Sequence, residues 1–125
     1  MHSVSALRRS LSIATSYAKV RKIRGGTQLL QDTPLHVAQL ASLHLTYRAL
    51  THFSFGVVHL LGKSECGTAS AEERHLLRIM TPTVKAFATE KAVPAIADAM
   101  SALGGNGYME ENDIPRLLRD AMVER

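Results

Sequence analysis

Two short segments of the sequence combine residue types that can hold an anion. The first, residues 21–26, reads Arg-Lys-Ile-Arg-Gly-Gly, and the guanidinium of Arg21 can offer paired donors to a phosphate group. The second, residues 104–108, reads Gly-Gly-Asn-Gly-Tyr, and residues without a Cβ let backbone amides approach phosphate oxygens. Each segment alone is also typical of an ordinary helix end, because glycine stops helices and arginine is favoured at a helix C-terminus.

Other chemistries are not indicated by the spacing of their residues. Four histidines recur at intervals of seven or eight residues: His36, His44, His52 and His59. On a helix these intervals separate side-chain origins by about 11–12 Å, too far for one metal ion to be shared. The adjacent acids Glu110 and Glu111 precede a helix start, which favours surface charges over an acid–base pair.

Length and composition indicate one folded domain. The chain has 125 residues, of which 46% are hydrophobic and 21% charged, values typical of globular domains. Charged residues interrupt every apolar run before it reaches the ~20 residues that cross a bilayer, so no membrane span is expected.

Charge is unevenly distributed along the chain. The first acid is Asp32, and all charged side chains before it are basic: Arg8, Arg9, Lys19, Arg21, Lys22 and Arg24. Such a cationic segment favours an anionic partner, including DNA bound non-specifically. A basic, serine-rich and acid-free N-terminus is also typical of a mitochondrial transit peptide, which leaves a cytoplasmic and a mitochondrial location open.

Helices are expected on both sides of these two segments. Apolar residues recur every three or four positions and predict a helix over 3–24, stopped by Gly25 and Gly26. Thr33 and Pro34 predict the N-cap and first turn of a long helix that ends at Gly62.

A third helix is expected from a capping box that starts at Ser70, with kinks or a break at Pro82 and Pro94. A short, incomplete helix follows the glycine loop and reaches Arg125. No run alternates with a period of two over a strand's length. The sequence therefore predicts an all-α, antiparallel up-and-down bundle in which residues 1–125 form a single domain.

Two stretches resemble signatures of a known family. Residues 17–25 resemble the Tyr-Ala-x-x-Arg-x-x-Phe-Gly signature that opens the C-terminal helical domain of acyl-CoA dehydrogenases. Residues 102–108 and 115–121 resemble the second signature of that domain at the expected separation. The loop also resembles that of the AidB-like branch of adaptive-response flavoproteins, and the resemblance covers nearly the whole chain.

The resemblance implies a flavoprotein domain that binds FAD across a subunit boundary, in a homo-oligomer. Arg21 would pair with the pyrophosphate, and Gly25 would permit the turn beside it. The adenosine half would be met by the backbone of the loop residues Gly104, Gly105, Asn106 and Gly107. Two departures are Arg24, where the family usually has phenylalanine, and Ser101, where many members have glutamine.

The resemblance also implies that the catalytic machinery lies elsewhere. The proton-abstracting glutamate of most members follows the helix that reaches Arg125 here, so we expect no catalytic residue in this chain and no activity alone. The parent would oxidise an acyl-CoA thioester through flavin. The alternatives are a DNA-binding module and a helical interaction module without a ligand.

Overall fold

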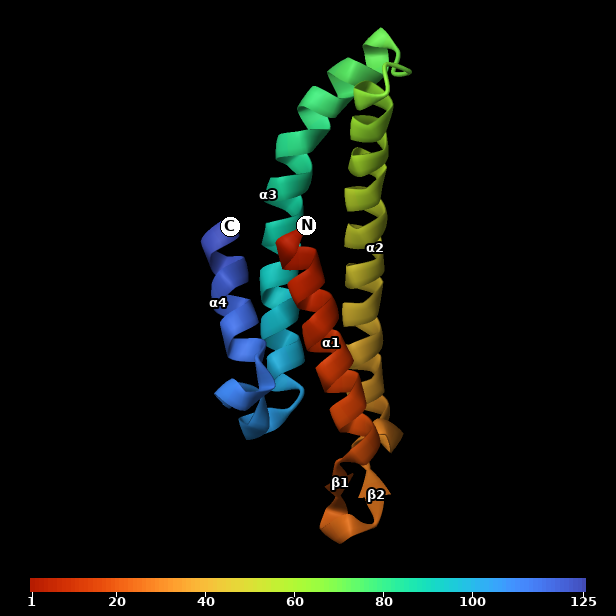
Figure 1. Ribbon diagram of the computed structural model, residues 1–125. Helices are drawn as coiled ribbons and strands as arrows, with labels where there is room; N and C mark the ends of the chain where they lie inside the picture. The colour runs from red at the N-terminus through yellow and green to blue at the C-terminus, as the bar shows by residue number, and fades with distance from the viewer.

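The computed structural model describes residues 1–125, which form four antiparallel helices (Figure 1). They are α1 (His2–Val20), α2 (Pro34–Glu65), α3 (Ala71–Ser101) and α4 (Ile114–Glu124). The predicted all-α, up-and-down bundle is confirmed. None of these helices is both long and apolar enough to cross a membrane.

The core forms where α1 packs against α2, α3 and α4. The apolar stripe expected on α1 is buried, with Leu7 and Leu11 almost fully enclosed. The facing side of α3 is built mostly from small residues at helical spacing, which let the two helices approach closely. They are Ala88, Ala92, Ala95 and Ala99.

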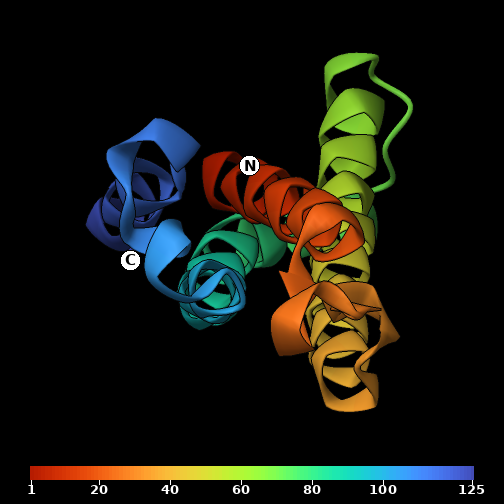
Figure 2. The ribbon, with the colours of Figure 1, turned by 90° about the horizontal axis from the view of Figure 1, so that it is seen from below.

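The helices are arranged unevenly around α1. Seen along the bundle, α4 and α2 lie on opposite sides, with α1 and α3 between them (Figure 2). The ends of α2 and α3 joined by residues 66–70 extend well past the N-terminus of α1 (Figure 1). Large apolar side chains are exposed on α2 and α3 at and beyond the level of the N-terminus of α1, including Phe55, Ile79 and Phe87.

A small hairpin replaces the predicted last turn of the first helix. The helix ends at Val20, and strands β1 (Lys22–Ile23) and β2 (Gln28–Leu29) pair antiparallel. The prediction of a helix to residue 24 and of no strand was therefore wrong. Gly25 lies in the turn between the strands with a φ of 66°, a conformation that glycine adopts without steric cost.

Of the kinks or break expected in the third helix, the break does not occur, since α3 runs through both Pro82 and Pro94. Both prolines are exposed, so the carbonyls that lose their amide partners at Arg78 and Glu90 can bind water. The helix is bent in Figure 1 but continuous. Its capping box is confirmed, because Ser70 Oγ accepts from Glu73 N at 3.1 Å.

The end of the second helix and the loop before α4 both differ from the prediction. The second helix continues past Gly62 to Glu65, since a glycine within a helix costs only about 1 kcal/mol. The glycine loop of residues 104–108 and the next turn of residues 110–112 form short 3₁₀ segments before α4.

Candidate functional site

The C-terminal end of α1 and the glycine loop meet in one groove. Its volume is about 380 Å³, near the lower end of the ~300–1,000 Å³ of ligand pockets. The lining residues come from the end of α1, the hairpin, the end of α3 and the loop: Tyr17, Arg21, Ile23, Leu30, Ala102, Leu103, Gly104, Gly105 and Asn106. The two segments from which an anion site was predicted, far apart in the sequence, therefore lie side by side.

Arg21 is fixed at the edge of this groove by its backbone. Its amide donates to Tyr17 O at 2.9 Å, and its carbonyl accepts from Leu30 N at 2.8 Å. The side chain is exposed, and it takes part in none of the ion pairs of the structure. Its guanidinium is therefore free to bind an anion from solution.

The glycine loop presents exposed backbone to the same groove. Gly104 and Gly105 are exposed, and an added Cβ at either would meet no atom within 4 Å. The side-chain amide of Asn106 donates to the hydroxyl of Tyr17 at 3.0 Å. This bond joins the loop to α1 across the groove.

Two of the residues expected at the site lie outside the groove lining. Gly25 is at the tip of the hairpin, where it shapes the turn that follows Arg21. Gly107 is buried, and an added Cβ there would lie 1.9 Å from the carbonyl oxygen of Met100. The departures Arg24 and Ser101 are also absent from the lining.

Sequence reasoning did not name Tyr17 as a site residue. Tyr17 precedes Arg21 by four positions, a spacing that puts two side chains on one helix face. That spacing was the available signal. The contributions of Ile23 and Leu30 had no such signal, because they depend on the hairpin.

Glu110, considered above for acid–base work, is held in an ion pair. Arg119 on α4 donates to both of its carboxylate oxygens, at 3.0 and 3.3 Å. These hydrogen bonds keep the pKa of Glu110 below its ordinary value. The carboxylate thus stays ionised at neutral pH and ties the turn of residues 110–112 to α4.

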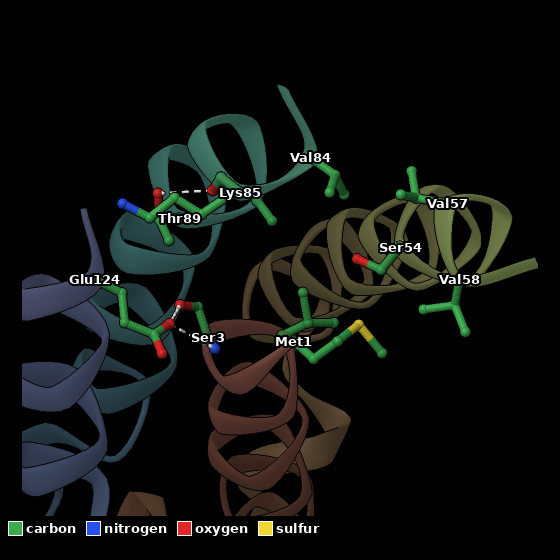
Figure 3. A pocket seen from close by; sticks show the side chains of 11 residues that line it. Met1, Ser3, Ser54, Val57, Val58, Val84, Lys85, Thr89 and Glu124 are labelled. Atoms are coloured by element: carbon green, nitrogen blue, oxygen red, sulfur yellow. Dashed lines mark hydrogen bonds between the residues drawn. The ribbon is translucent and has the colours of Figure 1, made fainter. Parts of the chain in front are cut away.

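A second cavity, of about 230 Å³, lies between the start of α1, α2, α3 and the end of α4 (Figure 3). Its lining is largely apolar. The one carboxylate there, that of Glu124, accepts hydrogen bonds from the amide of Ser3 at 3.2 Å and from the Ser3 hydroxyl. That acid is therefore already bound within the protein, and the cavity contains none of the residues expected to bind a ligand.

Known proteins match the chain over nearly its whole length. The family model described as the C-terminal domain of acyl-CoA dehydrogenase matches residues 1–125. Acyl-CoA dehydrogenase family member 11 of Caenorhabditis elegans is 39% identical over 97% of this chain and 19% of its own length. The putative acyl-CoA dehydrogenase AidB of Escherichia coli is 31% identical over 97% of this chain and 21% of its own length.

The fold agrees with these matches. The crystal structure of Caenorhabditis elegans ACDH-11 in complex with C11-CoA superposes with a TM-score of 0.91 and 37% identity, over 98% of this chain and 20% of that one. The chain thus spans about a fifth of the length of the relatives it matches. By sequence and by fold, the chain belongs to the acyl-CoA dehydrogenase family, as its C-terminal domain.

Proposed function

We propose that this domain binds the diphosphate and adenosine part of FAD in an acyl-CoA-oxidising flavoprotein, with the rest of the cofactor held by a neighbouring subunit. One observation carries the proposal: Arg21 lines the same groove as Gly104 and Gly105. An unpaired guanidinium and exposed glycine backbone in one groove are an arrangement suited to a diphosphate.

The residues present fit such a ligand in three respects. The guanidinium of Arg21 has no carboxylate partner, so binding an anion breaks no existing ion pair. Gly104 and Gly105 leave open the space that a Cβ would fill. The groove is open and of modest volume, which suits one part of a dinucleotide rather than a whole one. When bound, FAD would supply the hydride acceptor.

Titration calorimetry of the 125-residue chain with ADP tests this proposal. Arg21→Ala should weaken ADP binding about tenfold or more, since hydrogen bonds to charged groups are among the strongest in proteins. Lys22→Ala removes the same charge one residue away, outside the groove lining, and should change affinity by about twofold at most. Equal losses in the two variants would instead indicate general attraction to a basic surface.

We further propose that the domain self-associates through exposed apolar side chains on the parts of α2 and α3 at and beyond the level of the N-terminus of α1. Phe55, Ile79 and Phe87 are 57%, 63% and 47% exposed there, and exposed apolar patches of this kind mark association sites. Sedimentation should show a dimer or tetramer. A double substitution, Phe55→Asp with Ile79→Asp, should give monomers, whereas Val123→Asp on α4 should not.

Acyl-CoA oxidation itself is proposed to need parts of the protein beyond residues 1–125, because the chain spans about a fifth of its relatives. With added FAD, the chain should produce no enoyl product from any acyl-CoA. The alternative that the domain binds DNA has no support from the names of the relatives, which are dehydrogenases. If it were correct, DNA affinity would fall steeply with salt concentration.

A further inference from the structure

The hydroxyl of Tyr17 is joined to Asn112 by a relay of two hydrogen bonds, one to the backbone and one from the side chain of Asn106. The side-chain amide of Asn112 donates to the backbone carbonyl oxygen of Asn106 at 2.5 Å. The side-chain amide of Asn106 in turn donates to the hydroxyl of Tyr17 at 3.0 Å. The relay starts in the turn before α4, passes through the glycine loop and ends on α1.

This relay leaves the Tyr17 hydroxyl able to donate one hydrogen bond. A phenol has one proton to donate, and here its oxygen accepts from an amide nitrogen that can only donate. The hydroxyl makes no second hydrogen bond within the protein, so its proton remains available. A hydroxyl that accepts one hydrogen bond is polarised and becomes a stronger donor to the next acceptor.

The position of Tyr17 directs this donor toward the anion expected in the groove. Tyr17 lines the groove together with Arg21, which follows it by one helical turn. Four residues of α-helix advance about 6 Å along the helix axis, a separation that one diphosphate can span. Arg21 is the C-cap residue just past α1, so both residues can offer donors to the same ligand from the C-terminal end of that helix.

We propose that Tyr17 is a further ligand-binding residue that donates its hydroxyl proton to a phosphate oxygen, and that Asn112 positions it through Asn106. This inference rests on the function proposed above. Asn112 does not line the groove, so it acts through the relay and not by touching the ligand.

The experiment measures the affinity of the 125-residue chain for ADP and for inorganic pyrophosphate by calorimetry. Tyr17→Phe removes only the hydroxyl and should weaken binding of both probes about tenfold. Tyr108→Phe is the matched control, since Tyr108 is the last residue of the same loop, is 62% exposed and lies outside the groove lining. It should leave both affinities within about twofold.

A double-mutant cycle separates positioning by Asn112 from a general structural effect. Asn112→Ala should weaken ADP binding about threefold in the unsubstituted chain and cause no further loss in the Tyr17→Phe background. Thermal unfolding of each variant checks that the fold is kept, so that a loss of affinity is read only from folded protein.

The outcomes distinguish this inference from the proposed function. If the unsubstituted chain binds neither probe, the proposed function fails and the role of Tyr17 fails with it. If Arg21→Ala abolishes binding but Tyr17→Phe behaves like Tyr108→Phe, only the inference is overturned. If Asn112→Ala costs the same in both backgrounds, Asn112 is not a positioning residue.

Discussion

Gly107 packs directly on the backbone of Met100, so that an added Cβ would lie 1.9 Å from the carbonyl oxygen and 2.8 Å from the carbonyl carbon. Both atoms belong to the last turn of α3, which cannot move without displacing the core. Gly107 therefore holds the glycine loop against the helix end, while the loop residues before it face the groove.

This contact predicts that Gly107→Ala destabilises the domain. The clash is with backbone, so we expect a loss of about 3 kcal/mol in the free energy of unfolding, at the upper end of overpacking effects. Urea denaturation measures this. Gly105→Ala is the control, since its Cβ would meet nothing within 4 Å, and it should cost under about 1 kcal/mol. Similar stability of the two variants would contradict the packing role of Gly107.

The N-cap residues of α2 and α3 differ in their hydrogen bonds, which allows a second pair of substitutions to be compared. Ser70 caps α3 by accepting from Glu73 N, and Glu73 accepts from Ser70 N at 2.9 Å. Thr33 precedes α2 but makes no capping bond, and its buried hydroxyl has no partner. Ser70→Ala should therefore cost about 1 kcal/mol of unfolding free energy, whereas Thr33→Ala should be near neutral. Equal costs in chemical denaturation would contradict this difference.

The helical bundle could be predicted because the spacing of apolar residues shows which face of each helix is buried. Leu7, Leu11 and Ala14 return every three or four positions and are buried together, as amphipathic helices require. The hairpin could not be predicted, because strands of two residues are too short to show alternation. Its turn also needs a positive φ at Arg24, which no pattern of residue types indicates.

The groove was predictable in part. Arg21 and the loop residues were found from the chemistry of guanidinium and glycine, and the structure brings Arg21 to Gly104, Gly105 and Asn106. The role of Gly107 in packing depends on where the Met100 carbonyl lies. The bond between Asn106 and Tyr17 joins residues 89 positions apart, and such a contact follows only from the tertiary fold.

The two isoleucines of α3 differ in burial, and they should therefore contribute differently to the stability of the core. Ile96 is fully buried, whereas Ile79 on the same helix is 63% exposed. Ile96→Ala should lower the free energy of unfolding by about 2–5 kcal/mol, because it removes buried methyl groups and leaves a cavity. Ile79→Ala should cost under about 1 kcal/mol. Thermal unfolding at a concentration where the chain is monomeric compares the two.

Stability should also depend on pH through the ion pair that joins α2 to α3. Lys63 donates to Glu73, and this hydrogen bond is the main cause that lowers the pKa of Glu73 from its ordinary 4.5. A carboxyl whose pKa is lower in the folded state contributes stability that is complete above the unfolded value and is lost as pH falls through the folded one. The contribution should therefore be present at pH 7 and disappear as the pH falls below about 4.5.

Glu73→Gln tests this dependence without removing the capping box, since glutamine can also accept from the Ser70 amide. In urea denaturation at pH 7 and pH 3, the variant should lose less stability on acidification than the unsubstituted chain. Glu72→Gln is the control, because Glu72 lies in the same first turn but forms no ion pair. It should keep the full acid sensitivity. If the two variants respond alike to acid, Lys63 does not stabilise the folded state through Glu73.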